Sequence, residues 1–202
     1  MAVGRYDSRR AAVVDDANAI GTTYLRAQTL REPIRTRSLE DLVRYTDTSI
    51  RLSASVPGSA SSRDAIADGD SLHRSLWQLA GEALAGSPED SAPRLYVESL
   101  NEMIDMQTVR VSALNNRVPS AVLVIEVAGA AIALSLLAMY LAIISRGVVS
   151  VVLAAVLVSV LLLITFDLDR PTRGFVRVPA KPLVDLRASM ELPPAAQAPN
   201  EP

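Results

Sequence analysis

The sequence predicts an all-α membrane protein, in which a cytoplasmic helical bundle precedes a C-terminal two-helix transmembrane hairpin. Two observations carry this prediction. Two uncharged apolar runs, residues 127–145 and 148–166, follow each other almost directly. A helix needs about 20 apolar residues to cross roughly 30 Å of hydrocarbon, so each run is long enough. Before them, residues 1–118 place apolar side chains at helical spacing between loops rich in Ser, Pro and Gly.

Composition excludes several classes of function. The formal net charge is −2 and aromatic residues make up 4% of the chain, so we expect no nucleic-acid partner. The sequence contains no Cys and a single histidine, His73, which excludes thiolate metal sites and histidine clusters within one chain. Neither a Gly-rich phosphate loop nor a nucleophile elbow is present. We therefore expect no cofactor and no enzymatic activity.

The region 1–118 is predicted to form four helices of a cytoplasmic domain. Gly21 is the only interruption in the first helix and costs about 1 kcal/mol relative to Ala. Pro33 suits the first turn of the second helix because its missing N–H is not needed there. The loop "SVPGSASS", residues 55–62, separates the second helix from the third. The predicted helices cover residues 5–31, residues from Pro33 onward, residues 63–85 and residues 94–118.

Residues 119–166 are predicted to form the hairpin, with spans at about 121–145 and 148–166. The connection is so short that the two spans must run antiparallel and leave both flanks on one side. Arginine and lysine are more frequent on the flanks than at the tip, which carries Arg146 alone. The positive-inside tendency therefore predicts a multi-pass membrane protein with both termini in the cytoplasm.

After the hairpin, residues 167–191 are predicted to be cytoplasmic. Pro171, Pro179 and Pro182 disfavour helix, so an extended segment is expected up to residue 180, followed by a short helical turn near 182–191. Residues 192–202 are predicted to be a disordered tail, because they are rich in Pro and Ala and poor in large apolar side chains.

The first helix carries a polar stripe, defined here as Asp15, Asn18, Thr22 and Arg26. These residues recur every three or four positions and therefore share one helical face. One interpretation is an ion path or a subunit interface, in which Asn and Thr offer neutral donors to an anion and Arg26 supplies charge. The other is a hydrogen-bonded face that packs against a neighbouring helix or water.

Two further candidates lie at the membrane. Glu126 stands in the first span, and a carboxylate in hydrocarbon is usually functional because it is costly to bury. It lies only about two turns past Pro119, however, so it can also reach interfacial water. The run "DLDRPTRG" could lock the end of the second span to the cytoplasmic helices, or it could be an ordinary charged interfacial anchor. Its charged residues are Asp167, Asp169, Arg170 and Arg173.

Several segments resemble the bestrophin-like domain family of bacterial membrane proteins. They are "RYDSRRAAVVDDANAIGTTYLRA", "LVRYTDTSIRL", "SLWQLA", "SLNEMIDMQTVRVSALNNRVP" and "FDLDRPTRGFVRV". Their order and spacing extend the resemblance over residues 5–187. It implies four membrane helices, of which the first pair would precede the segment "MAVGRYDSRR".

The family name records a relation to bestrophins, which are pentameric anion channels. The resemblance therefore implies a homo-oligomer in the lipid bilayer of the bacterial inner membrane that conducts an anion or is otherwise linked to ion movement. The alternative is a membrane anchor that transports nothing, whose cytoplasmic helices form a structural or regulatory module for a partner protein.

Overall fold

The computed structural model describes residues 2–116, 119–143, 147–168 and 178–195. Within these ranges the chain forms seven helices and no strand, which confirms the predicted all-α class. The helices are α1 (Ala2–Ala27), α2 (Ile34–Ala54), α3 (Ala60–Gly86), α4 (Ser91–Asn115), α5 (Ser120–Ile143), α6 (Val148–Leu168) and α7 (Lys181–Ser189).

The chain divides into two compact units. One contains Asp7–Asn115 and Val178–Pro202, and is called the bundle here. The other contains Met1–Tyr6 and Asn116–Arg177, and its helices α5 and α6 are called the hairpin.

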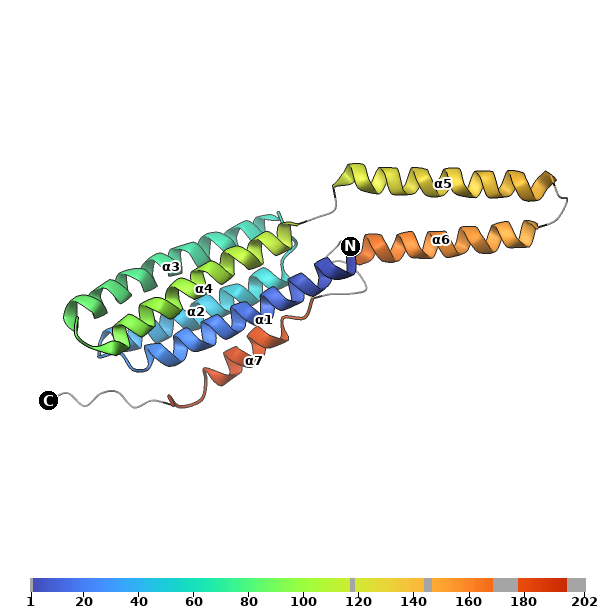
Figure 1. Ribbon diagram of the computed structural model, residues 1–202. Coiled ribbons are helices and arrows are strands. Elements are labelled where there is room, and N and C mark those ends of the chain that lie inside the picture. Colours follow the sequence, from blue (N-terminus) through green and yellow to red (C-terminus); the bar gives the residue numbers. More distant parts are fainter. Residues whose placement is uncertain (1, 117–118, 144–146, 169–177, 196–202) are drawn as a thin grey trace. The chain divides into compact units, whose positions relative to one another are not determined.

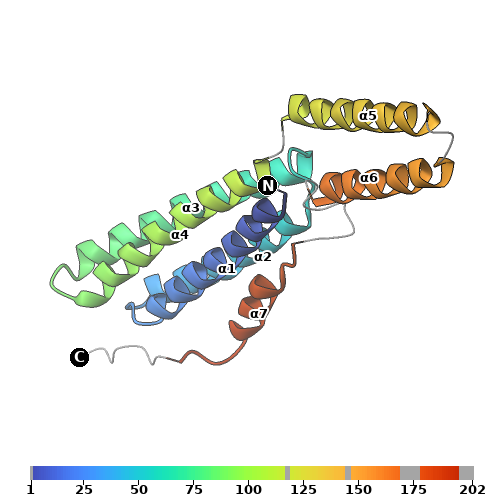
Figure 2. The same ribbon diagram turned by 45° about the vertical axis from the view of Figure 1, so that its right-hand side comes forward.

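In the bundle, α1 to α4 lie side by side, as Figures 1 and 2 both show. Helices α1 and α4 run antiparallel, because Thr23 Oγ1 donates to the Ser99 carbonyl at 3.0 Å while Arg9 Nε donates to the Ala113 carbonyl at 3.2 Å. The core between the helices consists of aliphatic and aromatic side chains that solvent does not reach. Its fully covered members include Ile20, Leu42, Leu76, Tyr96, Leu100 and Met103.

Several helix boundaries differ from the predicted ones by a few residues, and two of these differences have a clear cause. Helix α1 ends at Ala27, because the N–H groups of Thr29 and Leu30 form i→i−3 bonds that tighten the last turn, such as Leu30 N to the Ala27 carbonyl at 3.2 Å. Helix α3 begins at Ala60, inside the predicted loop. Ser59 is its N-cap and accepts the Ser62 N–H at 3.2 Å, so one of the loop serines starts the helix.

Helix α7 lies where the sequence predicted a short helical turn, near residues 182–191. It packs on α1 and α2. Leu183 is completely buried, and Tyr24 Oη donates to the Met190 carbonyl at 3.2 Å. A Cβ at Gly21 would meet Leu186 Cδ1 at 3.2 Å. The glycine that weakens α1 therefore gives α7 its close approach to that helix.

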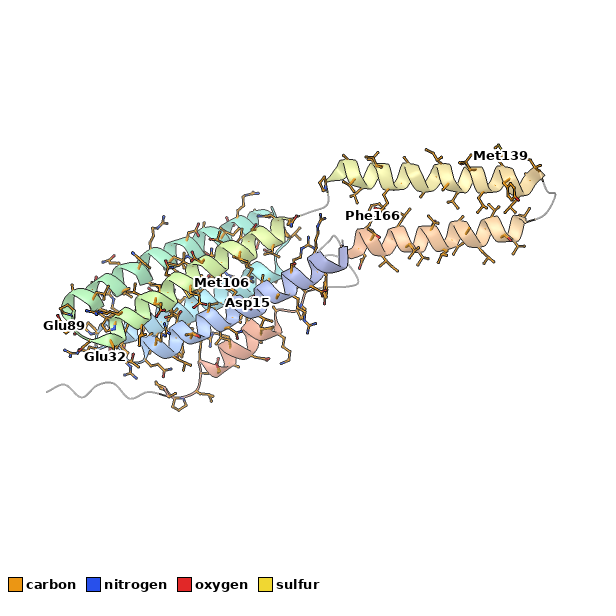
Figure 3. All side chains as sticks on the ribbon, viewed as in Figure 1. Asp15, Glu32, Glu89, Met106, Met139 and Phe166 are labelled. Carbon is orange, nitrogen blue, oxygen red and sulfur yellow. The ribbon has the colours of Figure 1, made fainter. Side chains whose placement is uncertain are left out.

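The hairpin consists of two helices that are long and apolar enough to cross a membrane, Ala121–Ile143 and Val148–Asp167. At about 1.5 Å per residue, 23 and 20 residues reach about 30 Å or more. Figure 3 shows side chains leaving both helices on every side. Two hydroxyls in these helices donate to their own backbones, which suits a lipid environment: Ser135 Oγ donates to the Ala131 carbonyl at 2.8 Å and Thr165 Oγ1 donates to the Leu161 carbonyl at 3.0 Å.

Small side chains do part of the packing between α5 and α6. Ala130 and Ala138 on α5 are half-buried, as are Ala154 and Ala155 on α6. At the tip, Gly147 has φ +112°, in the left-handed region that favours glycine. This residue directly precedes α6 and lets the chain enter the second apolar helix.

Candidate functional site

The middle of the bundle holds a buried ion pair between helices α1 and α4. Arg110 Nη1 donates to Asp16 Oδ2 at 2.5 Å, and the two side chains are 2% and 0% exposed. Two charges in such a setting lose their hydration, so each depends on the other to remain charged.

Helix α2 completes the surroundings of Arg110. Its Nη2 donates to the Ser49 carbonyl at 2.6 Å and to Ser53 Oγ. Asp16 Oδ1 and Arg110 Nε, both buried, have no hydrogen-bond partner among the described residues. Burial raises the pKa of the Asp16 carboxyl above its ordinary range, while the Arg110 charge opposes that shift. The pair thus links α1, α2 and α4, although one polar atom of each side chain lacks a hydrogen bond among the described residues.

A second polar chain runs from α2 through α4 to α3. Tyr45 Oη donates to Gln107 Oε1 at 2.9 Å, and Gln107 Nε2 donates to Asp70 Oδ1 at 3.3 Å. Burial raises the pKa of the Tyr45 hydroxyl above its ordinary range, and the charge of Asp16 adds to the shift. Tyr45 therefore lies within electrostatic reach of both the ion pair and this chain, and it remains a neutral hydrogen-bond donor.

His73 of α3 lies beside Tyr45, with ring centroids 4.8 Å apart and planes tilted by 39°. The imidazole is 8% exposed, and its Nε2 is buried without a hydrogen-bond partner among the described residues. Burial lowers the pKa of His73 to about 4, although the nearby Asp70 charge opposes the shift. The side chain is consequently neutral at neutral pH.

The polar chain ends at a cavity of about 220 Å³ between α3 and α4, called the side cavity here. Gly69 permits the close approach of these helices, because a Cβ at that position would meet the Gln107 amide at 3.3 Å. The cavity wall combines polar and aliphatic side chains. They are Ile66, Asp70, His73, Ile104, Gln107, Thr108 and Val111.

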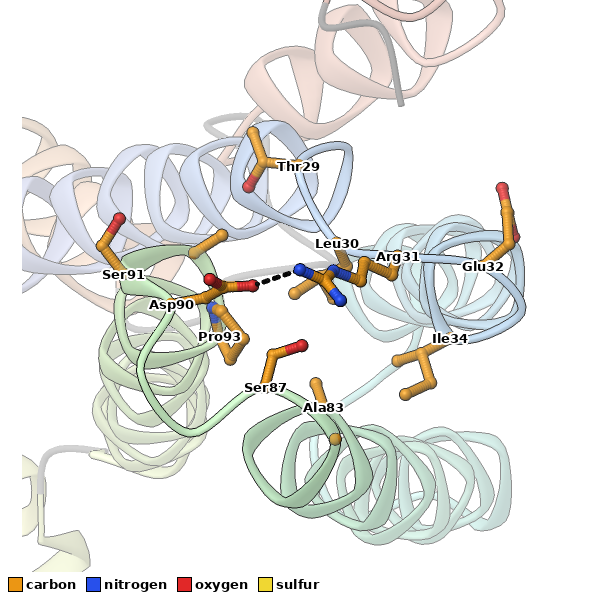
Figure 4. A pocket seen from close by; sticks show the side chains of 12 residues that line it. Thr29, Leu30, Arg31, Glu32, Ile34, Ala83, Ser87, Asp90, Ser91 and Pro93 are labelled. Carbon is orange, nitrogen blue, oxygen red and sulfur yellow. Dashed lines mark hydrogen bonds and ion pairs between the residues drawn. The ribbon is translucent and has the colours of Figure 1, made fainter. Parts of the chain in front are cut away.

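A larger pocket of about 520 Å³ lies at one end of the bundle, between the α1–α2 and α3–α4 connections. Figure 4 shows the ion pair that spans it, in which Arg31 Nη2 lies 3.0 Å from Asp90 Oδ2. Both side chains are substantially exposed, at 64% and 45%. Each charge in this pocket is therefore already paired and hydrated.

The polar stripe lies on the outer side of α1. Asp15, Asn18 and Thr22 are exposed, and Arg26 is half-buried. Arg26 Nη1 donates to the Leu95 carbonyl at 2.7 Å and lies 3.4 Å from Glu98 Oε2. Three stripe residues are thus open to contact, while Arg26 ties α1 to α4.

The structure places two of the predicted membrane residues. Glu126 is exposed on α5, and Asp167 is half-buried in the last turn of α6. The other three members of the predicted lock, Asp169, Arg170 and Arg173, lie outside the described residues. The lock therefore remains a prediction.

A family model described as Bestrophin-like domain matches residues 2–183. The chain belongs to the bestrophin-like domain family. This confirms the resemblance inferred from the sequence, and it places the bundle helices and both hairpin helices in one family domain, which identifies a helical membrane protein. No curated protein and no solved structure matches the chain.

The buried network of this bestrophin-like domain was not among the predicted sites. A signal for it exists in the sequence, because Asp16 shares the buried face of α1 with Val13 and Ile20. Likewise, Arg110 follows Met103 at helical spacing on the buried face of α4. A charge in register with core residues indicates a buried partner, but the sequence does not say which one.

Proposed function

We propose that the protein works as an oligomer in the membrane and lets anions cross the bilayer. The observation that supports this proposal is membership of the bestrophin-like family over residues 2–183, a range that includes both helices of the hairpin. Bestrophins, to which the family name relates, are anion channels.

The character of the hairpin supports an assembly of several chains. The only charged side chain of α5 is Glu126, and α6 carries only Asp167 in its last turn. An aqueous path needs polar groups or a wide opening, and one such hairpin supplies neither. A path would therefore form between the hairpins of several chains, and neighbouring helices would also shield the Glu126 carboxylate from lipid.

We further propose that both ends of the hairpin face the cytoplasm. The tip carries Arg146 alone, whereas the flanks carry seven basic residues: Arg110 and Arg117 before the hairpin, and Arg170, Arg173, Arg177, Lys181 and Arg187 after it. Protease added outside sealed inside-out vesicles should remove the bundle and leave the tip protected. Cleavage of the tip instead would contradict this orientation.

Ion flux tests the proposal. Purified full-length protein in liposomes loaded with chloride should release the anion faster than protein-free liposomes. The combined change Asn18→Leu with Thr22→Leu should reduce the release if the polar stripe lines the path. The matched control is Gln78→Leu, an exposed polar residue on α3. Absence of chloride flux at every salt concentration and pH tested would reject the proposal.

A second candidate is a membrane anchor whose bundle binds a partner protein. The exposed positions of Asp15, Asn18 and Thr22 favour it, because the apolar side chains of Val14 and Leu25 beside them are also 38% and 55% exposed. A mixed polar and apolar helix face suits a protein contact. This candidate expects the stripe variants to leave flux unchanged and to lose co-purification of the partner.

A further inference from the structure

Helices α1 and α4 carry most of the large apolar side chains that the four-helix part of the bundle exposes. Val14 and Leu25 of α1 are 38% and 55% exposed, and Leu95 and Val109 of α4 are 45% and 49% exposed. Helix α2, which is described throughout, exposes no large hydrophobic side chain. Exposed apolar side chains that gather on one surface are typical of a contact site.

The contacts that hold α1 on α4 arrange these side chains as two apolar pairs. Arg26 Nη1 donates to the Leu95 carbonyl at 2.7 Å, which places Leu25 and Leu95 at one end of the two helices. The buried ion pair between α1 and α4 brings Val14 and Val109 level with each other. The two pairs lie about three helical turns apart along α1.

The surface between the two apolar pairs is acidic. Between Leu95 and Val109, α4 exposes three carboxylates and no basic side chain. Between Val14 and Leu25, α1 exposes one carboxylate and two uncharged polar side chains. The whole surface is called the acidic face here. It consists of Val14, Asp15, Asn18, Thr22 and Leu25 of α1 and of Leu95, Glu98, Glu102, Asp105 and Val109 of α4.

The protein itself neutralises little of this negative charge. Glu98 Oε2 lies 3.4 Å from Arg26 Nη1, but Asp15 and Glu102 form no ion pair among the described residues. Asp105 Oδ2 accepts from a neutral side-chain amide at 3.4 Å. Each arginine of α2, in contrast, lies within 3.6 Å of a carboxylate. The acidic face therefore has a surplus of negative charge that α2 does not have.

We propose that the acidic face binds an amphipathic helix of a partner protein that is rich in Lys and Arg. Its apolar side chains contact the two apolar pairs, and its cations lie beside the carboxylates between them. A helix of three to four turns is long enough to reach both pairs. The proposal rests on the second candidate function, in which the bundle binds a partner protein, and it names the chemistry of that partner.

Two other occupants match the acidic face less well. A second copy that docked through the same face on a twofold axis would bring carboxylates against carboxylates, which costs free energy. An anionic lipid surface would be repelled by the same charges. A basic helix has the opposite charge and the same alternation of apolar and charged side chains.

Fluorescence anisotropy tests the proposal on the full-length protein in phosphatidylcholine nanodiscs, with empty nanodiscs as the blank. The probe is a fluorescein-labelled helical peptide of three heptads with Leu at positions a and d, Lys at e and g, and Ala elsewhere. Saturable binding above the blank is expected, with a dissociation constant on the order of 10 μM. The same peptide with Glu in place of Lys should bind at least about tenfold more weakly.

Two variants of the acidic face and two matched controls locate the binding site. Glu102→Lys should weaken binding about fivefold or more, because it replaces an attraction by a repulsion. The combined change Leu25→Gln with Leu95→Gln removes one apolar pair and should weaken binding by a similar factor. The controls are Glu40→Lys, which reverses an exposed charge of α2, and Trp77→Gln, which removes an exposed apolar side chain of α3. Both should leave the affinity unchanged.

Three results would overturn the proposal. They are the absence of saturable binding above the blank, equal affinity for the Lys and Glu peptides, and equal losses in Glu102→Lys and Glu40→Lys. Light scattering then identifies a second copy as the occupant if Leu25→Gln with Leu95→Gln turns an oligomer into a monomer. The readout is peptide binding, so this failure is distinct from an absence of chloride flux. It is also distinct from failure of the second candidate, which is judged by co-purification of the partner.

Discussion

The bundle and the hairpin use opposite chemistry. The bundle encloses a charged pair, Asp16 and Arg110, among aliphatic side chains. The hairpin presents its apolar side chains outward, for example Ile125 at 71% and Leu153 at 64% exposure. In water the bundle can bury its apolar residues without help, whereas the hairpin must find lipid or other membrane helices.

This difference shows where each unit carries its specificity. In the bundle, a single position decides whether a buried polar group has a partner, so one substitution has a large effect. In the hairpin, one aliphatic residue can replace another, because lipid tails are as apolar as Leu.

Loss of the buried arginine should destabilise the bundle most. Arg110→Met leaves Asp16 buried without its counter-charge, which should cost about 3–5 kcal/mol of unfolding free energy. Urea unfolding of the full-length protein in detergent measures it through the fluorescence of Trp77, the only tryptophan of the chain, which lies on α3 of the bundle.

The control is Arg51→Met, which breaks an ion pair of 2.7 Å to Asp68 whose side chains are 56% and 55% exposed. It should cost about 0–1 kcal/mol. Replacing both buried partners, as in Asp16→Leu with Arg110→Met, should restore most of the stability. Equal losses for the two arginine variants would show that burial of the pair is unimportant.

The next largest loss of unfolding free energy should come from replacing a leucine of the bundle, whereas the same substitution in the hairpin should have little effect. Leu76 is 0% exposed in the core, so Leu76→Ala should cost about 2–5 kcal/mol. Leu161 on α6 is 56% exposed, and Leu161→Ala should change the unfolding reported by Trp77 by less than about 0.5 kcal/mol. A similar loss in both variants would mean that the two units unfold together.

An acidic pH should weaken the bundle through His73. Its folded pKa of about 4 lies below the ordinary value of 6.5, so between these values the unfolded state binds more protons and stability falls as pH falls. The slope from one such group is at most about 1.4 kcal/mol per pH unit. His73→Phe should remove this component, while the raised pKa of Asp16 acts in the opposite direction in both proteins.

The measurement is the difference in unfolding free energy between the wild-type protein and His73→Phe from about pH 7 to pH 4.5. The wild-type protein should lose stability relative to the variant as the pH falls. A difference that stays constant over this range would contradict the low pKa.

The smallest effect on stability should come from the polar stripe. Asp15→Ala, Asn18→Ala and Thr22→Ala alter exposed side chains of α1, so each should shift the unfolding free energy by less than about 0.5 kcal/mol. Denaturation in detergent checks this result. A loss of more than about 1 kcal/mol would mean that the stripe packs within the protein.

The sequence predicted the elements better than the site. Apolar spacing indicated the four bundle helices, and the uncharged runs indicated the hairpin, because both patterns are local. The polar stripe was found because its members share one helix. Asp16 stands next to Asp15 in the sequence, yet its partner Arg110 is far away along the chain, so local spacing could not connect them.

Helical periodicity, the two apolar runs and the family motifs are properties of the sequence by itself. They determined the all-α class, the hairpin and the family, because each depends on neighbours within a few turns. Only the tertiary structure decided that Asp16 and Arg110 form an ion pair. It also decided that Leu186 packs closely against Gly21 and that Gln107 packs closely against Gly69. These contacts join different helices, and their geometry depends on how the helices pack.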